Sequence, residues 1–413
     1  MKHILLIWNI TLLLSACSEE EPLLNGNYPN VPYDPNVVPL ELVWKYPLYA
    51  DTLPVLSMAP MLYQNGVLVS RQTMTLGLDA TMMLLDTNGT GPIWTTDPSF
   101  CDECHSLSIL SGDGNAIWQN IFIGLCDADP RAVDMNTGSV LWHHTITPGH
   151  GPRISILQDE VFHTNNTGIN PFTSTSIVRS KIIDNVWDTI ITINAVDAYS
   201  VQIEPPAFDF NAQGDTLLFF QVRGWKSGPY DEKYDLYAYN MSADSMVWVK
   251  YDPDPFGGSA IYPPTIYDHK VYFQAAWTLY CYDEYSGEEL WHQNMPIGTE
   301  DLLYSNLLIA ENKLIVKTSG ETLYAFDPVS GMQLWKADDV GASPSDMVYF
   351  EGVVYYGSGG DGNIHAVNIS SGEQLWELDA GENNGVFWSS VVIDPLLRRL
   401  YAHNNIYLYC YKL

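Results

Sequence analysis

The sequence predicts an all-β protein, an eight-bladed β-propeller of four-stranded blades closed by pairing of its N-terminal and C-terminal strands. Three observations support this fold. A strand–turn–strand unit that ends in Trp recurs along the chain, the Trp residues follow at a regular distance, and each end carries part of one unit. The single propeller domain is expected to span residues 41–413, after a signal peptide (1–16) and a tether (17–40).

The repeated unit joins an alternating strand to a second strand through a tight turn. In "AFDPVSGMQLW" (325–335), Asp327 can cap the turn with its side chain, and Gly331 supplies the positive φ that the reversal needs. The Trp at the end is large enough to cover the gap between one sheet and its neighbour. Related units occupy residues 84–94, 132–142, 238–248, 281–291 and 366–376.

The Trp spacing gives the number of blades. Successive distances are 48, 106, 43, 44 and 41 residues for Trp94, Trp142, Trp248, Trp291, Trp335 and Trp376. The distance of 106 is close to two periods, and strand-like residues 176–193 with Trp187 predict a hidden blade within it. The C-terminal segment "RRLYAHNNIYLYCYKL" stops before a Trp strand, and "ELVWK" (41–45) with Trp44 supplies that strand. The count is therefore eight.

The segment "GSGGDGNIHAVNISSGEQLWEL" (357–378) resembles the repeat of the PQQ-like propeller family, which includes quinoprotein alcohol dehydrogenases and an assembly lipoprotein of the outer membrane. The resemblance covers most of residues 41–413 and is weakest between Trp142 and Trp248. It implies a ring in which Trp residues dock between blades, but it does not decide the function. The expected docking residues are Trp44, Trp94, Trp142, Trp248, Trp291, Trp335 and Trp376.

The N-terminus predicts export. Lys2 precedes an apolar run (4–14) that is too short to span a bilayer and ends in Leu-Ser-Ala-Cys. This ending resembles the lipobox of bacterial lipoproteins, in which Cys17 is acylated; an ordinary secretory signal is the alternative. We expect a protein anchored by lipid to the outer membrane, and surface exposure is left open. The acidic, Pro-rich residues 18–40 read as an extended spacer.

The charge excludes several classes of partner. The formal net charge is −31, and removal of residues 1–16 takes away Lys2 and no acid, which leaves 17 basic and 49 acidic residues, or −32. Such a surface repels phosphate backbones and anionic headgroups. We therefore expect no nucleic acid and no membrane contact beyond the lipid anchor.

The motif "CDECH" (101–105) matches the C-x-x-C-H pattern of covalent haem attachment through Cys101, Cys104 and His105. However, it falls in the connection after the Trp94 strand rather than on a helix, so a disulfide among Cys101, Cys104 and Cys126 is the preferred interpretation. Haem attachment and metal binding remain alternatives. Cys281 and Cys410 replace small residues of the repeat and are expected to be buried space-fillers.

No catalytic residue, metal site or cofactor is predicted. The adjacent Cys pair of many quinoprotein dehydrogenases is absent from the sequence, as are a nucleophile elbow, a His-Glu-x-x-His motif and a phosphate-binding loop. The enzyme question stays open, because a redox protein that carries PQQ or covalent haem c is the alternative function.

The preferred function is a non-catalytic scaffold, expected to be a monomeric propeller, which binds an envelope protein or an extracellular ligand. The candidate contact segments are two stretches that appear irregular, residues 163–176 and 223–235, because repeat proteins often carry insertions on the binding face. Their aromatic residues are either binding anchors or cover for the core of their own blades. These residues are Phe172, Trp225, Tyr230 and Tyr234.

Overall fold

In the computed structural model the chain forms two units, Met1–Pro32 and Tyr33–Leu413. The propeller lies in the second unit. Among the described residues there is no helix with the length and apolar character needed to cross a membrane. The structure describes residues 40–48, 58–73, 79–96, 115–126, 129–144, 154–167, 172–196, 200–204, 206–225, 232–251, 253, 262–275, 277–295, 305–342, 345–379, 385–404 and 406–413.

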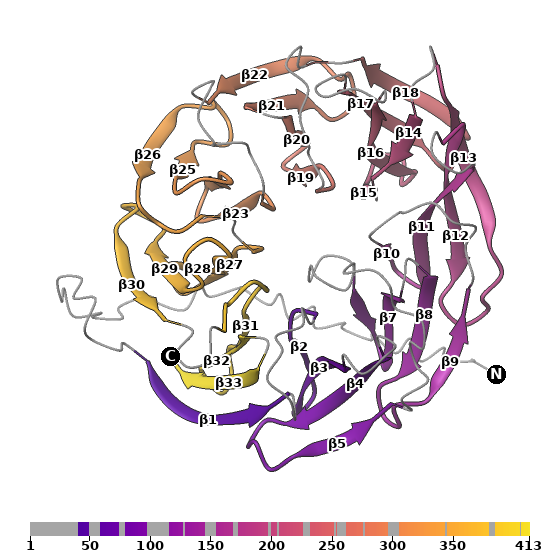
Figure 1. Cartoon of the computed structure of the whole chain (residues 1–413). Coiled ribbons are helices and arrows are strands. Elements are labelled where there is room, and N and C mark those ends of the chain that lie inside the picture. The colour runs from indigo at the N-terminus through magenta and orange to yellow at the C-terminus, as the bar shows by residue number, and fades with distance from the viewer. Residues whose placement is uncertain are drawn as a thin grey trace, which may run out of the picture. The chain divides into compact units, whose positions relative to one another are not determined.

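Eight antiparallel sheets form the ring, and each is one blade (Figure 1). Blade 1 contains β2 (Met61–Tyr63), β3 (Gly66–Thr73), β4 (Asp79–Asp86) and β5 (Pro92–Thr95). Blade 2 contains β6 (Ala116–Trp118), β7 (Ile121–Cys126), β8 (Asp129–Asp134) and β9 (Val140–His143). Blade 3 contains β10 (Ile154–Leu157), β11 (Glu160–Thr167), β12 (Ser174–Lys181) and β13 (Asp188–Asn194). Blade 4 contains β14 (Ser200–Ile203), β15 (Ala207–Phe210), β16 (Thr216–Trp225), β17 (Glu232–Asn240) and β18 (Ser245–Lys250).

The other four blades follow the same order. Blade 5 contains β19 (Thr265–Tyr267), β20 (Lys270–Ala275), β21 (Thr278–Asp283) and β22 (Glu289–Asn294). Blade 6 contains β23 (Leu308–Ala310), β24 (Lys313–Lys317), β25 (Leu323–Phe326) and β26 (Gln333–Ala337). Blade 7 contains β27 (Val348–Phe350), β28 (Val353–Gly357), β29 (Ile364–Asn368) and β30 (Gln374–Leu378). Blade 8 contains β31 (Val392–Asp394), β32 (Arg399–His403), β33 (Tyr407–Lys412) and β1 (Glu41–Pro47).

The ring closes as the sequence predicts. β1 pairs with β33 from Glu41 opposite Lys412 to Pro47 opposite Tyr407, and Figure 1 shows the indigo β1 beside the yellow β33. The two ends of the domain therefore share one sheet, which leaves fewer open sheet edges and holds the first strand in place. The predicted eight-bladed propeller is confirmed.

Blade 4 departs from four strands. Both β14 and β15 pair with β16, at Ile203 opposite Val222 and at Ala207 opposite Phe219. The position of the inner strand is thus divided in two. The sequence between them contains two consecutive prolines, which have no N–H to continue the ladder.

The predicted Trp docking is present between most blades. The indole Nε1 donates to a backbone carbonyl of the next blade at 2.6–3.2 Å, and Trp376 packs into the apolar cluster that contains residues of blades 7 and 8. The six donor and acceptor pairs are Trp44 and Thr87, Trp94 and Met135, Trp142 and Ile182, Trp248 and Glu284, Trp291 and Pro328, and Trp335 and Ile369.

Turn glycines make this docking possible. In five blades the Trp ring lies against a glycine with φ between +66° and +76°, where an added Cβ would be 2.6–2.7 Å from the ring. Only Gly combines that φ with so close an approach. These glycines are Gly89, Gly138, Gly287, Gly331 and Gly372.

Trp187, the weak counterpart in the hidden blade, is placed differently. It precedes β13, its ring stacks on His144 at 4.7 Å, and it meets Trp142 edge-on at 6.3 Å. Its Nε1 donates to Asn185 of its own turn at 2.7 Å. Trp187 therefore packs back against blade 2, and the expectation that it is a counterpart of the docking residues is wrong.

The residue paired with each docking Trp is usually small. Ala132, Ala238, Ala325 and Ala366 occupy this position in four blades, and Cys281 and Cys410 occupy it in two others. Both cysteines are fully buried and not in disulfides, and burial raises the pKa of Cys281 to about 12 and that of Cys410 to about 11. Their predicted burial as space-fillers is confirmed, and the high pKa keeps the thiols protonated.

Candidate binding site on blades 3 and 4

The two segments predicted to be irregular are mostly hairpin. Pairing of β11 with β12 continues to Thr167 opposite Ser174, and pairing of β16 with β17 continues to Trp225 opposite Glu232. Residues 168–171 and 226–231 lie outside the described residues. We call these two elements the blade 3 hairpin (residues 160–181) and the blade 4 hairpin (residues 216–240). Their Thr, Val, Phe and Tyr residues favour strands, so the prediction of irregular structure is wrong for most of both segments.

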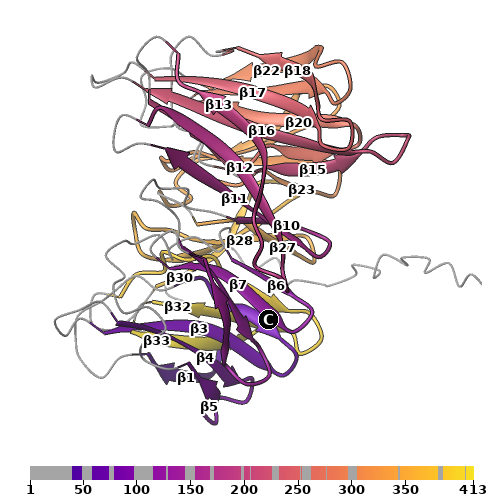
Figure 2. The same ribbon diagram turned by 90° about the vertical axis from the view of Figure 1, so that its right-hand side faces the viewer.

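These hairpins are longer than their counterparts in the closely matching blades. Their strands have eight to ten residues, whereas the central strands of blades 5 to 7 have four to six. Figures 1 and 2 show blades 3 and 4 next to each other. The long hairpins therefore occupy adjacent positions on the ring.

The aromatic residues predicted as anchors are mostly inside the packing. Tyr234 is 2% exposed within the cluster of apolar residues from blades 4 and 5, and Phe172 is 8% exposed. Trp225 is half-buried and meets Phe172 edge-on, with 5.7 Å between ring centroids. Tyr230 lies outside the described residues. Phe172 and Tyr234 therefore support their own blades. Trp225 and Tyr230 are the two residues left as candidate binding anchors.

Buried polar contacts tie the blade 3 hairpin to the inner strand of blade 4. The backbone N–H of Phe172 donates to the Ser200 hydroxyl at 2.8 Å, and the N–H of Ile203 donates to the Thr175 hydroxyl at 3.1 Å. Thr175 is fully buried and Ser200 is 2% exposed, so these bonds form away from water, where a lost partner would be costly. The inner strand β14 of blade 4 is thus fixed to the end of the blade 3 hairpin.

An apolar cluster replaces Trp docking between these blades. Phe162 and Ile177 of blade 3 pack with Leu218 and Phe220 of blade 4, and all four side chains are fully buried. Phe162 also lies 4.7 Å from the ring of Phe208 on β15. The sequence signals for this junction are ordinary alternating strands, so a search for the Trp unit does not find it.

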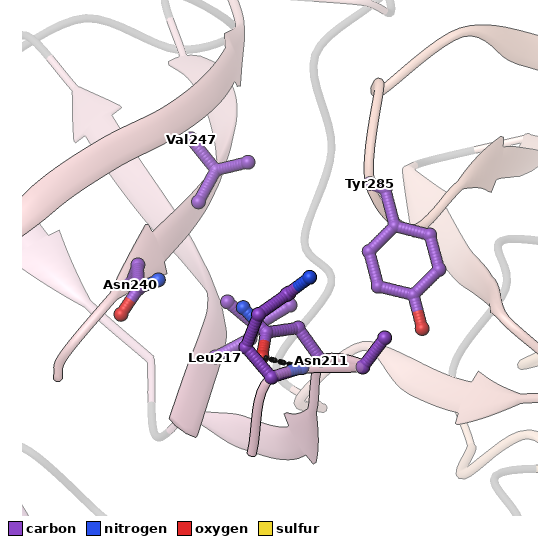
Figure 3. A pocket seen from close by; sticks show the side chains of 7 residues that line it. Asn211, Leu217, Asn240, Val247 and Tyr285 are labelled. Carbon is purple, nitrogen blue, oxygen red and sulfur yellow. Dashed lines mark hydrogen bonds between the residues drawn. The ribbon is translucent and has the colours of Figure 1, made fainter. Parts of the chain in front are cut away.

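A pocket of about 360 Å³ lies where a turn of blade 4 meets a turn of blade 5. Figure 3 shows Tyr285 of blade 5 on one side, Asn240 and Val247 of blade 4 on the other, and Asn211 between them. Asn211 and Asn240 each donate to Asp215 at 3.0 Å, and these hydrogen bonds lower the pKa of Asp215. This pocket could not be predicted from the sequence, because two blades must meet to form it.

Two groups of side chains have the spacing that a metal ion would need. Asp209, His269 and Glu284 lie next to the pocket, and Asp361, His365 and Glu377 lie in blade 7; in each group the donor atoms are within 4.8 Å of one another. Burial raises the pKa of Asp361, but the hydrogen bond from His365 and its charge lower it further, to about 2. Asp361 is thus ionised and held by His365 at 2.9 Å.

The other predicted site residues are not tested by the structure. Cys17, Cys101, Cys104 and His105 lie outside the described residues, and Cys126 ends β7 with a side chain that is not described. Lipid attachment, the disulfide and the haem alternative therefore stay predictions.

Comparison with protein families finds a model that matches part of the chain. Residues 231–409 match the family model described as outer membrane protein assembly factor BamB. Comparison with curated proteins finds no match.

Three solved structures illustrate the likeness. BamB from Moraxella catarrhalis is 15% identical, with a TM-score of 0.55 over 91% of this chain and 98% of that one. The quinohemoprotein alcohol dehydrogenase from Comamonas testosteroni is 13% identical, with a TM-score of 0.64 over 90% and 76%. The computationally designed Ika8 protein is 13% identical, with a TM-score of 0.60 over 88% and 98%. At these identities the likeness shows the fold alone.

Proposed function

We propose that this chain, a PQQ-like β-propeller that resembles BamB, is a lipid-anchored scaffold that binds another protein of the cell envelope. The likeness to BamB supports a scaffold role. The finer parts of the proposal, which are the anchor at Cys17, the outer membrane and the partner, rest on the sequence.

The observation that carries the proposal is the pair of hairpins on blades 3 and 4. They depart from the regular repeat, are longer than those of blades 5 to 7, and are held together by Phe172 and Trp225. A rigid pair of strands offers a partner a preformed surface, which lowers the entropy lost on binding. Irregular blades in a repeat protein are also where binding elements commonly lie.

Photo-crosslinking in the native membrane tests this surface. A photoreactive amino acid at Thr173, an exposed residue of the blade 3 hairpin, is expected to crosslink a discrete envelope protein. The matched control is Glu321, an exposed residue between the equivalent strands β24 and β25 of blade 6, where no such product is expected.

Variants then separate binding from folding. Trp225→Ala and Tyr230→Ala should reduce the crosslink from Thr173, whereas Cys104→Ala and His105→Ala should leave it unchanged. Unfolding by urea serves as the folding control for each variant. Equal crosslinking from Thr173 and Glu321, or no effect of Trp225→Ala and Tyr230→Ala, would rule out the hairpin surface.

The alternative is a redox protein with PQQ or covalent haem, and the dehydrogenase-like fold is the observation in its favour. PQQ is a tricarboxylate, so its site needs cationic or metal donors. Lys317, a fully buried cation on β24, already donates to the carbonyls of Gly320 and Gly341 at 2.6 Å. Gln221 and Gln274, at equivalent places on β16 and β20, donate to the carbonyls of Tyr262 and Ser305. These side chains hold backbone connections, so this set does not fit PQQ.

A further inference from the structure

One backbone hydrogen bond recurs between the two turns on the same side of a blade. In blade 1 the N–H of Thr87 donates to the carbonyl of Asn65, and in blade 2 the N–H of Met135 donates to Asn120. The corresponding bond in blade 5 joins the N–H of Glu284 to the carbonyl of His269 at 3.1 Å. Blades 3 and 7 have the bond between Ile182 and Asp159 and between Ile369 and Gly352. These pairs define equivalent positions in the repeat.

At these positions blade 5 alone, among those five pairs, combines an acid with an imidazole. The first position also accepts the docking Trp, and its occupants elsewhere are uncharged: Thr87, Met135, Ile182, Pro328 and Ile369. Blade 5 has Glu284 there, under Trp248. The second position is Asn, Asp or Gly in the other four pairs, as expected for a turn, and blade 5 has His269 at φ +57°. Packing or turn geometry does not require either residue.

Glu284 is a buried acid with an unfilled bonding position. Its side chain is fully buried, and within the described residues its Oε1 has no hydrogen-bond partner. Burial raises the pKa of Glu284, and the nearby Asp209 carboxylate adds to this rise. Burying a carboxylate without a full set of partners is costly, and a cation bound at this oxygen would offset that cost.

His269 and Asp209 lie beside the Glu284 carboxylate, and the three side chains come from two blades. His269 Nδ1 lies 3.2 Å from Glu284 Oε2, and Asp209, on β15 of blade 4, completes a set whose donor atoms are all within 4.8 Å of one another. Ligands about 2.0–2.1 Å from a tetrahedral ion lie about 3.3 Å apart, which matches the His269 and Glu284 separation. A mixed set of imidazole and carboxylate donors suits zinc-like ions better than Ca²⁺ or Mg²⁺.

We propose that Asp209, His269 and Glu284 form a binding site for a divalent first-row transition ion, with Zn²⁺ as the best match. The ion joins strand β15 of blade 4 to two turns of blade 5, beside the pocket that Tyr285 lines. Three protein ligands leave a fourth position for water. The site is independent of the scaffold proposal, since it lies at blade turns and not on the two hairpins.

A simple ion pair between His269 and Glu284 is the competing explanation. The His269 side chain is 66% exposed, and its Nδ1 also lies 2.9 Å from the Tyr285 hydroxyl. This nitrogen therefore has two neighbours, Tyr285 and Glu284, within hydrogen-bond distance. A protonated His269 would also face two carboxylates with a single charge. The ion pair therefore leaves Glu284 Oε1 without a partner among the described residues, whereas a divalent ion would bind all three side chains.

Zinc binding to the full chain tests the site, using protein that has been treated with chelator and titrated with micromolar Zn²⁺ by calorimetry. The variants His269→Asn and Glu284→Thr copy the residues of blade 1, so they suit the fold, and Asp209→Asn removes the third ligand. The matched control is His292→Asn, because His292 forms an exposed pair with Glu289 at 2.7 Å in the same blade.

The expected result is one tight equivalent of Zn²⁺ that survives excess Ca²⁺. Each of the three variants should weaken this equivalent by about 100-fold or more, whereas His292→Asn should leave it intact. Urea unfolding without metal should show that His269→Asn and Glu284→Thr are folded. The proposal is overturned if no equivalent binds, if Ca²⁺ displaces it, or if folded His269→Asn and Glu284→Thr bind Zn²⁺ as the parent chain does.

Discussion

Blades 5 to 7 and blades 3 and 4 have the same antiparallel arrangement, but the junction between blades 3 and 4 differs from the junctions that follow blades 5 and 6. Trp291 and Trp335 each donate to the next blade and cover a turn glycine. Between blades 3 and 4 an apolar cluster around Phe162 and Phe220 performs this role, and Trp187 turns back to blade 2. Blade docking therefore depends on burying a large apolar surface, and the Trp–Gly pair is one way to do so.

The difference between these blades also indicates which of them stabilise the ring and which are available to bind a partner. The central strands of blades 5 to 7 are short, with four to six residues. Those of blade 1 have eight residues, although Trp44 docks on Gly89 of that blade. At the junction between blades 3 and 4 an apolar cluster takes the place of the docking Trp, and both of these blades carry long hairpins. We infer that the regular blades maintain the ring while the irregular pair is available for a partner.

The largest difference in the free energy of unfolding is expected between two variants, one without a docking Trp and one without Trp187. Trp335→Ala should lower the free energy of unfolding by about 3–5 kcal/mol, because it empties a blade junction and leaves the Ile369 carbonyl without its donor. Trp187→Ala should cost about 1–2 kcal/mol, since this side chain is only partly buried. Urea unfolding measures both values, and equal losses would break the distinction between the two kinds of blade.

A smaller difference in stability is expected between alanine substitutions at two glycines with positive φ. Gly331→Ala forces a Cβ to 2.6 Å from the Trp291 ring at φ +70°, so overpacking adds to backbone strain, and the loss should be about 2–4 kcal/mol. Gly214→Ala, at φ +84° in the turn between β15 and β16, meets nothing within 4 Å and should cost about 1 kcal/mol. Thermal unfolding of the two variants checks the order, and a Gly214→Ala loss as large as that of Gly331→Ala would contradict it.

The stability of blade 7 should depend on pH through the ionisation of Asp361. The pKa of Asp361 is lowered to about 2 in the folded chain, against about 3.9 in the unfolded chain. A lowered pKa stabilises the fold above about pH 4, and this contribution is lost as the pH falls towards 2. Because the side chain is 37% exposed, its screened value should be about 1 kcal/mol.

Asp361→Asn should accordingly be about 1 kcal/mol less stable than the parent chain at pH 5, with the difference shrinking as the pH approaches 2. Urea midpoints at several pH values measure this. A difference that stays constant with pH would mean that the His365 bond, rather than the charge, accounts for the effect.

The smallest effect is expected opposite the docking Trp. Cys281→Ala should change the free energy of unfolding by less than about 1 kcal/mol, because four other blades have Ala at that position. The reciprocal change Ala325→Cys should be similarly mild. A loss of several kcal/mol in either variant would show that the blades are less interchangeable than their register indicates.

The sequence predicted what is local and repeated. The spacing of Asp327, Gly331 and Trp335 is set within one unit, so the blade count, the docking and the ring closure could all be predicted. Contacts between two blades that no repeated residue marks could not be predicted. The pocket beside Tyr285 and the junction at Phe162 bring together residues whose separate patterns are ordinary strands and turns.

One signal of the metal site was present in the sequence. Aligned units show Glu284 where other units have Thr87, Met135, Pro328 and Ile369, but an acid in a turn of so acidic a chain attracts no notice. Its significance depends on the Trp248 ring that buries it and on the neighbouring His269, which only the fold reveals.

We propose that this propeller works by binding and not by redox chemistry, and an absorption spectrum distinguishes the two. The chain would be extracted from its native membrane without added cofactor and measured oxidised and after reduction with dithionite. We predict no haem band and no releasable quinone. A haem band that survives denaturation, or a quinone released on unfolding, would contradict the claim and assign the protein to electron transfer.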